Sequence, residues 1–336
     1  MKIAIVGASG VLGRQVVNKI VQRLEDNKQQ IDLTVVASKK SVGRQISAGD
    51  NHVLNLLALE AFLGDSDHYD ILISALPRVV HEKWRSSLEG KAQKIIDLSG
   101  ATSLEQDVVS LYDCVDIDLS QTSFSIVQSV SYGLIKLSNK LKSVLDVPVQ
   151  RIVATAMMAA SENGKASMDE LYEQAKKAFV HQSLPIKQYD KQIAFNLLPR
   201  HGVLLSDRQN HQEWHIRSEF LKAMGKDVAL GLTTVQVPVF IGTALSLTIE
   251  FDDEVLSQDV LAQLQEDSDF IVMDNRQFET YATPLDVASA PQILISRIRE
   301  DWSHDTALNL WMCVDNLEIR SNLTADLIEA FIPQFG

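Results

Sequence analysis

The sequence predicts an α/β protein with two domains: an N-terminal doubly wound parallel sheet and a C-terminal α+β domain built on an open sheet. Three observations lead to this expectation. A short apolar run, Ile3–Val6, leads directly into Gly7, Gly10 and Gly13 and then into an amphipathic segment. Strand-like and helix-like segments alternate through the first third of the chain, which is typical of a parallel sheet covered by helices. The last third instead shows apolar residues at every second position, which indicates half-buried strands.

The glycine turn after the first strand is the candidate nucleotide site. Its G-x-x-G-x-x-G spacing aims backbone N–H groups and a helix N-terminus at one point, where a dinucleotide pyrophosphate can bind. We expect Gly7 to form the turn, Gly10 to let the backbone approach the phosphates, and Gly13 to let helix and strand pack closely. Ser9 and Val11 complete the binding segment. Because the spacing differs by one residue from the commonest fingerprint, a strand-to-helix turn without a ligand is the alternative interpretation.

The elements of the N-terminal region follow from periodicity and from glycine and proline punctuation. Strands are expected at Ile3–Val6, Leu33–Ala37, Ile71–Ala75, Lys94–Asp97 and Phe124–Gln128, and helices at Arg14–Gln29, Ala58–Leu63 and Val79–Leu88.

The C-terminal region predicts helices around an open, largely antiparallel sheet. One helix is expected over Ser167–His181, with Ser167-x-x-Glu170 as a capping box and Met168, Leu171, Ala175 and Phe179 on its apolar face. Another is expected over His211–Met224, ended by Gly225. Strands are expected at Thr233–Ile241, Leu245–Phe251, Ile293–Arg299 and Leu308–Val314. A last helix, 317–331, has Leu323, Leu327, Ile328 and Phe331 as its apolar residues.

Composition excludes several classes of function. The net charge of −13 over 336 residues makes nucleic acid and anionic membrane surfaces poor partners. We expect no membrane-spanning segment and no signal peptide, because the apolar run Ile3–Val6 is short and ends in glycines. The only cysteines, Cys114 and Cys313, form neither a disulfide framework nor a metal-ligand cluster, so we expect a cytoplasmic protein without a bound metal.

Several stretches together resemble the aspartate-β-semialdehyde dehydrogenase family along almost the whole chain. Besides the glycine turn, they are Ala37–Gly43, Ala194–Pro199, Val237–Phe240 and Trp311–Asn316. The resemblance implies a Rossmann NAD(P)-binding domain over 1–130, a semialdehyde dehydrogenase dimerisation (catalytic-type) domain over 131–315, and a C-terminal helix, 316–336, that returns to the N-terminal domain. It also implies a homodimer or tetramer, with a homodimer expected here, and reduction of an acyl phosphate by NADPH through a cysteine thioester.

The catalytic positions implied by the resemblance are not kept. Counting back from the strand at Arg151, the family's cysteine falls on Ser131, and the glutamine four residues later is Ile135. The family's histidine base falls on Thr243. A serine hydroxyl is a far weaker nucleophile than a thiolate unless a base lies beside it, and threonine is no base at neutral pH. Cys114 lies in an acidic stretch that disfavours a thiolate, so we do not expect it to replace the nucleophile.

The groups that would hold the substrate anions are also mostly absent. The two expected arginines are Gln236 and Thr102. Glu219 and Lys222 remain as substrate-binding remnants on one helix face. Their alternative interpretation, which we favour, is a solvated helical ion pair. The histidines His201, His211 and His215 are expected to be exposed.

The cofactor positions divide into two groups. On the nicotinamide side, Glu162 and Leu76-Pro77 stand where the family has glycines. On the adenosine side, Ser38, Lys40 and Ser41 suit a 2′-phosphate at the end of the second strand, with an ordinary polar loop as the alternative.

The sequence therefore favours a catalytically inactive dehydrogenase-like protein of a divergent Usg-type branch, with NADP binding possible. It predicts a homodimer with no nucleic acid, membrane or metal partner and names no protein partner. Two alternatives stay open: an active NADP-dependent semialdehyde dehydrogenase of amino-acid biosynthesis with an unusual site, and a structural dimer without a ligand.

Overall fold

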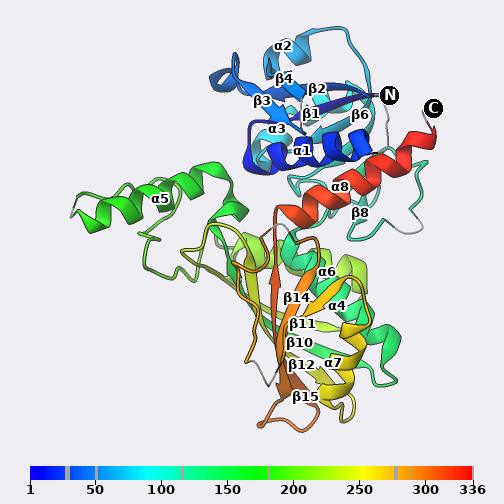
Figure 1. Ribbon diagram of the computed structural model, residues 1–336, viewed down its shortest axis with the longest axis vertical. Coiled ribbons are helices and arrows are strands. Elements are labelled where there is room, and N and C mark those ends of the chain that lie inside the picture. The colour runs from blue at the N-terminus through cyan, green and yellow to red at the C-terminus, as the bar shows by residue number, and fades with distance from the viewer. Residues whose placement is uncertain are drawn as a thin grey trace. The chain divides into compact units, whose positions relative to one another are not determined.

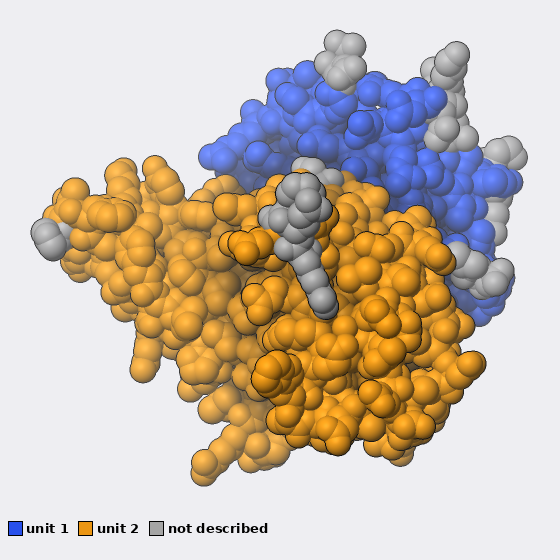
Figure 2. Space-filling model, turned by 60° about the horizontal axis from the view of Figure 1, so that its bottom comes forward, with its two compact units in different colours: residues 1–127, 320–336 blue, residues 128–319 orange. Residues whose placement is uncertain are grey.

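The computed structural model describes residues 1–26, 31–49, 52–114, 117–180, 182–275, 279–288 and 290–334. The chain divides into two compact units, coloured in Figure 2. Unit 1 comprises Met1–Val127 and Arg320–Gly336, and unit 2 comprises Gln128–Ile319. Within the described ranges, none of the helices combines the length and the apolar character that a membrane span needs.

Unit 1 is built on a seven-stranded sheet in the order β5-β2-β1-β6-β7-β9-β8, in which every pair of neighbours is parallel. The strands are β1 (Lys2–Val6), β2 (Asp32–Ala37), β5 (Leu57–Ala58), β6 (Tyr69–Ser74), β7 (Ala92–Asp97), β8 (Val109–Leu111) and β9 (Ser123–Ile126). The helices are α1 (Val11–Asp26), α2 (Leu59–Gly64), α3 (Arg78–Glu89) and most of α8 (Glu318–Phe331), as Figure 1 shows. The doubly wound domain expected from the sequence is confirmed.

Most boundaries in unit 1 lie within a few residues of their expected positions. Helix α1 begins at Val11 rather than Arg14, and the end expected for it, 27–29, lies outside the described residues. The strand expected over Phe124–Gln128 ends at Ile126, because Gln128 is already the N-cap of the next helix. The antiparallel hairpin of β3 (Gln45–Ala48) and β4 (His52–Asn55) was not expected. Its strands are too short to show a clear alternation.

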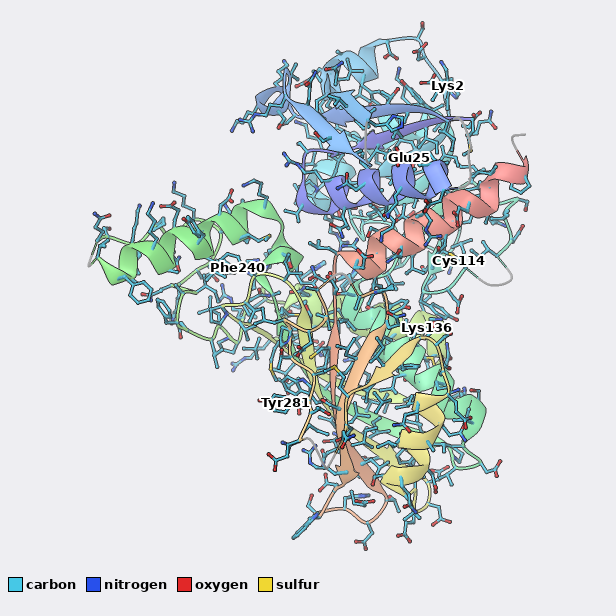
Figure 3. All side chains as sticks on the ribbon, in the orientation of Figure 1. Lys2, Glu25, Cys114, Lys136, Phe240 and Tyr281 are labelled. Carbon is cyan, nitrogen blue, oxygen red and sulfur yellow. The ribbon has the colours of Figure 1, made fainter. Side chains whose placement is uncertain are left out.

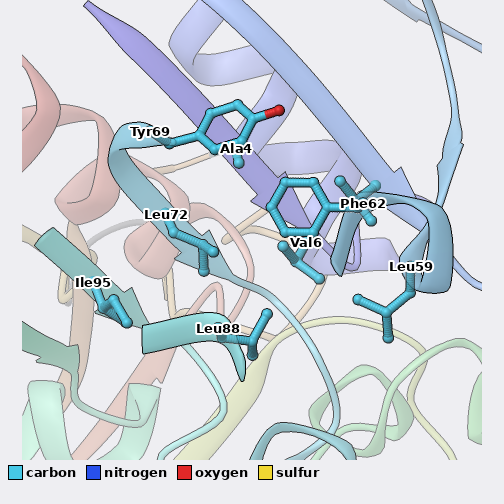
Figure 4. Close-up of a cluster of buried hydrophobic side chains, with 9 residues drawn as sticks. Ala4, Val6, Leu59, Phe62, Tyr69, Leu72, Leu88 and Ile95 are labelled. Carbon is cyan, nitrogen blue, oxygen red and sulfur yellow. The ribbon is translucent and has the colours of Figure 1, made fainter. Parts of the chain in front are cut away.

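The core of unit 1 forms where β1, β2, β6 and β7 meet α2 and α3. A cluster of nine buried side chains fills this space, several of them labelled in Figure 4: Ala4, Val6, Val36, Leu59, Phe62, Tyr69, Leu72, Leu88 and Ile95. The rings of Phe62 and Tyr69 lie 5.3 Å apart. Each large apolar side chain buried here contributes about 1.5–3 kcal/mol to folding, so the cluster holds the strand ends, and the glycine turn after β1, in place.

Helix α8 is fixed to unit 1 by its apolar face and by charge pairs. The predicted residues Leu323, Leu327, Ile328 and Phe331 are all buried. The ring of Phe331 contacts Phe124 of β9 edge-on. Arg23 of α1 forms ion pairs with Asp326 and Glu329 at 2.7 Å. The last turns of the chain therefore belong to the N-terminal unit, although they are the farthest from it in sequence.

Unit 2 is built on a six-stranded mixed sheet in the order β11-β10-β12-β15-β14-β13. The strands are β10 (Val149–Met158), β11 (Ala229–Gln236), β12 (Thr243–Phe251), β13 (Phe270–Val272), β14 (Ile293–Glu300) and β15 (Ala307–Val314). The helices are α4 (Ser129–Val144), α5 (Lys165–Phe179), α6 (His211–Met224) and α7 (Ser257–Gln265). In Figure 1, α5 projects from the rest of this unit.

The sheet of unit 2 corrects one expected boundary and has a strand order that the sequence did not predict. The strand expected over Thr233–Ile241 ends at Gln236, because Pro238 has no N–H for a ladder and the carbonyls of Val239 and Phe240 accept from Ala160 and Ser161. β11 and β12 are successive strands but do not pair. β10 lies between them, parallel to β11 and antiparallel to β12.

Helix α5 also corrects a prediction. The expected capping box at Ser167 is wrong, because the helix already begins at Lys165, after Gly164 with a φ of +82°. Ser167 Oγ instead donates to the carbonyl of Asn163, and the Glu170 carboxylate accepts from the backbone of Lys187 and Gln188. Glu170 therefore ties a following loop to the helix.

The expected apolar face of α5 is buried only in part. Leu171 is 2% exposed, whereas Phe179, at the end of the helix, is 77% exposed and contacts the ring of Phe195.

Helix α6 carries the capping box that α5 lacks. The Asn210 side chain accepts from Glu213 N–H while the Glu213 carboxylate accepts from Asn210 N–H, and Gly225 ends the helix with a φ of +71°. This confirms the predicted bounds, His211–Met224. The buried residues include His215 and Glu219, so a polar face of α6 is directed into unit 2.

Candidate functional site

The glycine turn lies at the carboxyl end of β1, where ligands bind to sheets of this kind. Gly7 has a φ of +93°, and a Cβ there would lie 2.5 Å from the Ala75 carbonyl oxygen. A Cβ on Gly13 would lie 2.2 Å from the Gly7 carbonyl oxygen. The first helical hydrogen bond runs from Arg14 N–H to Gly10 O, so the amides of the preceding turn have no intrahelical acceptor. Their geometry suits an anion at the helix N-terminus.

The second nucleotide-binding segment lies at the end of the neighbouring strand. β2 pairs in parallel with β1, with Val36 opposite Val6. Directly after β2, Ser38 precedes a short 3₁₀ turn, Lys39–Ser41, in which Ser38 and Lys40 are exposed and Ser41 is half-buried. Since parallel strands end at one edge of the sheet, these side chains and the glycine turn share that edge.

The serine expected at the family's nucleophile position is buried and hydrogen-bonded. Ser131 lies in the first turn of α4, a helix that the sequence analysis did not predict. Its side chain is 0% exposed. Its hydroxyl donates to Glu219 Oε2 at 2.5 Å. The same oxygen accepts from Gln128 N–H, at the N-cap of α4. Ile135, one turn further along, is 0% exposed.

Glu219 is the centre of a buried network rather than a solvated ion pair. It is 1% exposed, and its other oxygen lies 3.2 Å from His215 Nε2, which is equally buried. The expectation of an exposed His215 is therefore wrong. His215 and Glu219 are four residues apart on α6, so both face the interior. Lys222, three residues beyond Glu219, is exposed.

The expectation for the other two histidines is wrong as well, because His201 and His211 are half-buried rather than exposed. The rings of His211 and His215 lie nearly parallel, 6.1 Å apart. The ring of His201 packs against Tyr189, and burial lowers the pKa of His201.

A second carboxylate, Glu162, links Thr243, the residue expected at the family's base position, to the first turn of α4. Thr243, the first residue of β12, is 0% exposed and donates to Glu162 Oε1 at 2.8 Å. Ser129 donates to the same oxygen at 2.5 Å. Glu162 lies in the 3₁₀ turn η2 (Ala160–Asn163). Two glutamates thus each accept from a serine in the first turn of α4.

The two positions where arginines were expected serve local structure. In unit 2, Gln236 is 2% exposed and its side-chain oxygen accepts from Asn163. In unit 1, Thr102 N–H and Oγ1 donate to Asp97 Oδ2, which closes the loop after β7. Neither side chain can form the charge-assisted, bidentate contact that arginine makes with a carboxylate or phosphate.

Neither cysteine resembles a catalytic thiolate. Burial raises the pKa of the Cys313 thiol to about 12, and its sulfur accepts from Trp311 Nε1 at 3.1 Å. Cys114, labelled in Figure 3, belongs to unit 1, where its thiol lies 3.6 Å from the Leu323 carbonyl oxygen. Among the described residues there is no histidine, cysteine or carboxylate group arranged to hold a metal ion.

The site of unit 2 therefore combines hydroxyls with two carboxylates. Such a set donates and accepts protons but repels anions. It offers a serine beside a carboxylate, without the thiol that thioester chemistry needs.

Sequence reasoning missed helix α4 and the role of His215. The four-residue spacing of His215 and Glu219 on a predicted helix was the available signal for their contact.

The comparisons with known proteins agree with this architecture. A family model described as "Semialdehyde dehydrogenase, NAD binding domain" matches residues 2–131, and one described as "Semialdehyde dehydrogenase, dimerisation domain" matches residues 141–319. Aspartate-semialdehyde dehydrogenases of Rickettsia bellii and Rickettsia conorii are 32% and 30% identical to the chain. Each alignment covers 94% of this chain and 92% of the relative.

Solved structures share the fold at lower sequence identity. Aspartate semialdehyde dehydrogenase II from Vibrio cholerae, complexed with ASA, superposes with a TM-score of 0.87 at 19% identity over 100% of this chain and 99% of that one. Aspartate semialdehyde dehydrogenase with NADP from Candida albicans has a TM-score of 0.67 at 16% identity, covering 98% of both chains.

Proposed function

Because the chain belongs to the aspartate-semialdehyde dehydrogenase family, we propose that it is a divergent, catalytically inactive member that binds a nicotinamide dinucleotide without carrying out the thioester reaction. The observation that carries this proposal is the state of Ser131. This residue stands at the family's cysteine position, is fully buried, and donates its hydroxyl hydrogen to Glu219. No thioester can form on it, and a serine ester is a poorer hydride acceptor.

The surrounding charges support the same proposal. The reaction implied by the family needs cations for a carboxylate and a phosphate. This chain has Gln236 and Thr102 at the two arginine positions, and Glu162 near the first turn of α4. A negative side chain beside an anionic substrate opposes binding.

The proposed cofactor is NADP, held at its phosphate end. The pyrophosphate would lie against the segment Ser9, Gly10 and Val11 at the helix N-terminus, with Gly7 and Gly13 shaping the turn. The 2′-phosphate would be bound by Ser38, Lys40 and Ser41. The positive φ and tight Cβ spaces of the glycine turn support the first part of this assignment, and the shared sheet edge supports the second.

We further propose that the protein is a cytoplasmic homodimer. The dimerisation-domain match over residues 141–319 supports the assembly.

One observation favours a second candidate function, an active enzyme with an unusual nucleophile. Ser131, Glu219 and His215 form a hydrogen-bonded series in which a carboxylate could accept the serine proton. If this candidate is right, the wild type turns over substrate and Ser131→Ala abolishes the turnover. If the protein is inactive, the wild type shows no turnover.

The decisive experiment combines binding with turnover. We expect calorimetric titration to show saturable NADP binding. We expect no aspartate-semialdehyde oxidation above background in the presence of NADP and phosphate or arsenate. Turnover would overturn catalytic inactivity, and absence of binding to both NADP and NAD would favour the structural dimer.

A matched pair of variants tests the nucleotide turn. Gly10→Asp places a carboxylate on the phosphate site, where even a Cβ would lie 3.2 Å from the Gly7 carbonyl oxygen, and should abolish NADP binding. Gly64→Asp adds the same charge to unit 1 at an exposed position with open space around it and should leave binding unchanged. Equal affinities in the two variants would contradict the assignment of the turn.

A further inference from the structure

The carboxyl ends of three neighbouring strands of unit 1 form one row. Val6 of β1 is opposite Ser74 of β6, which in turn is opposite Asp97 of β7. The row continues past the sheet, where Leu98 N–H donates to the Ser74 carbonyl. Since Gly7 follows Val6 directly, the glycine turn lies at the first strand of this row. Asp97 lies two strand spacings away, which is about 10 Å.

Beside this row lies a buried histidine to which the proposed nucleotide site assigns no role. His81 of α3 is 2% exposed, and its Nδ1 lies 2.7 Å from Ser74 Oγ. The same nitrogen is 3.6 Å from Asp97 Oδ1, which is too far for a hydrogen bond. Ser74 and Asp97 are both 0% exposed. A titratable ring is therefore enclosed between the ends of β6 and β7.

The hydrogen bonds of Asp97 show that its carboxylate is ionised. Oδ1 accepts from Ser99 N–H and Ser99 Oγ, and Oδ2 accepts from Thr102 N–H and Thr102 Oγ1, at distances of 2.6–3.0 Å. Four donors fill the acceptor positions of a carboxylate and leave no place for a carboxyl proton. Asp97 is therefore a buried anion at the same sheet edge as the turn that is proposed to hold phosphates.

The contacts of His81 fit a neutral ring in the ligand-free protein. The Ser74 hydroxyl lies at hydrogen-bond distance from Nδ1 and can donate to it when that nitrogen carries no proton. A proton on Nδ1 would gain no hydrogen bond to Asp97, because the distance is too long and the carboxylate is already fully bonded. The hydrogen-bond network thus makes Ser74 the donor and His81 the acceptor.

The charges nearest to His81 on its own helix do not offset Asp97. Arg85, one turn further along α3, lines a cavity of about 10 Å³ together with His81. Its guanidinium forms ion pairs with Glu89, at 2.6 Å, and with Glu105 of the loop after β7. One cation thus pairs with two carboxylates, and this cluster has no positive charge to spare.

The cations on the other elements around His81 are directed to carbonyl oxygens. Lys94 of β7 donates to two loop carbonyls, at 2.7 and 2.9 Å. Arg320 of α8 donates to the carbonyl of Leu98. Within the described ranges, His81 is the one basic side chain within ion-pair distance of Asp97. It is therefore the group that can offset the charge of that carboxylate.

We propose that NADP binding at the glycine turn is coupled to the uptake of one proton by His81. This inference rests on the proposed function, because it concerns how the same site receives its phosphates. While His81 is neutral, the buried charge of Asp97 repels the phosphates. When His81 takes a proton from solvent, the imidazolium offsets that charge, and Nδ1 becomes the donor to Ser74 Oγ. His81 is thus a positioning residue whose protonated form favours the bound state by linkage.

Calorimetric titration of the full chain with NADP at pH 6.5 and pH 8.5 tests this proposal. We expect the affinity to be at least about threefold higher at pH 6.5, because unit charges about 10 Å apart change a binding constant by this order even when salt screens them. The 2′-phosphate of NADP itself takes up a proton near pH 6, which acts in the opposite direction. A variant without the titrating ring therefore provides the reference.

Two matched histidine variants locate the proton. His81→Asn keeps an acceptor for the Ser74 hydroxyl but takes up no proton, so it should lose the preference of the wild type for pH 6.5. His68→Asn removes an exposed histidine directly before β6, at the opposite end of that strand, and should keep the wild-type pH profile. His81→Gln provides the same comparison if circular dichroism shows that His81→Asn is misfolded.

Titration in two buffers that differ in ionisation enthalpy counts the protons directly. At pH 7.5 the wild type should take up a fraction of a proton more per NADP bound than His81→Asn does. Equal proton uptake in the two proteins, or the same pH profile in both, would overturn this inference and leave nucleotide binding intact. Absence of NADP binding at every pH would instead overturn the proposed function, and this inference with it.

Discussion

At the residue scale, the difference from a thioester enzyme is concentrated in the contacts of a few side chains. Ser131 differs from cysteine by one atom, and its hydroxyl is held by a buried carboxylate. Glu219 accepts its hydroxyl at 2.5 Å and is itself buried against His215. A carboxylate in this position opposes a thiolate, because two negative charges a few ångströms apart in a buried site repel each other strongly.

Restoring the thiol should therefore not restore the activity. In a Cys114→Ser background, the Ser131→Cys thiol should have a raised pKa and should react with a disulfide reagent at pH 7.5 at least about tenfold more slowly than an exposed cysteine. It should support no aspartate-semialdehyde oxidation.

The charge on Glu219 provides the control. Adding Glu219→Gln to that variant should speed the thiol reaction, because the repulsion is removed. A fast reaction with Glu219 intact, or measurable turnover, would contradict this account of the site.

Cys313 predicts an alkaline limit to stability. Burial raises its pKa from an ordinary value of 9.0 to about 12. Between those values the folded state keeps a proton that the unfolded state loses. The contribution of Cys313 to stability is therefore fully present below pH 9 and is lost as the pH rises towards 12, by about 1.4 kcal/mol per unit.

Urea unfolding of the wild type and of Cys313→Ala between pH 8 and 10.5 measures this effect. The variant should show the shallower decline, with the remaining slope owing to groups such as Tyr189, whose pKa burial also raises. Identical slopes would exclude Cys313 as the cause.

At the element scale, capping decides which helix positions the site. Helix α6 carries Glu219, and its first turn is fixed by the reciprocal Asn210–Glu213 bonds and by Asn210 Nδ2 donating to Thr234 of β11. In α5, the serine that the sequence pattern marked as a cap lies inside the helix instead. A polar residue followed three positions later by glutamate is therefore a capping box in α6 but not in α5.

Two substitutions distinguish these helices. Asn210→Ala should lower the free energy of unfolding by about 1–2 kcal/mol, since it removes a cap and a buried hydrogen bond. Ser167→Ala should cost less than about 0.5 kcal/mol, because Ser167 lies inside α5 rather than at its cap, and the bond from its hydroxyl to the Asn163 carbonyl is long, at 3.4 Å. Chemical denaturation gives both values, and a larger cost at Ser167 would contradict the corrected start of α5.

At the scale of the whole molecule, the two units carry different parts of the family's chemistry. Unit 1 keeps the parallel sheet and the glycine turn that suit a dinucleotide. Unit 2 keeps the mixed sheet but has carboxylates and hydroxyls where the thioester reaction needs a thiol and a base. We therefore propose that nucleotide binding and chemistry are separable in this chain.

Hydrogen exchange measured by mass spectrometry should show this separation. Saturating NADP should slow exchange at the glycine turn and around Ser38–Ser41, and at 100 times its dissociation constant should stabilise the folded state by about 2.7 kcal/mol. Amides around Ser131 and Glu219 should show little added protection. Equal protection in both units would indicate a fully engaged nicotinamide and would favour the active enzyme.

The sequence by itself determined the fold class, most strands of both sheets, the glycine turn and the absence of cysteine and histidine from the implied catalytic positions. These features are local: a period of two or 3.6, a glycine at a forced φ, or a residue type at a given place in the chain. It also predicted the bounds of α6 and the buried face of α8.

Only the tertiary structure decided how the remaining polar residues are used. It placed β10 between β11 and β12, buried His215 and Glu219, and brought Ser131 and Ser129 each to a carboxylate distant in sequence. It also placed a β-bulge between Ser296 and Arg299 of β14. These contacts join residues tens of positions apart, and their free energies depend on burial and exact partners, which no local pattern records.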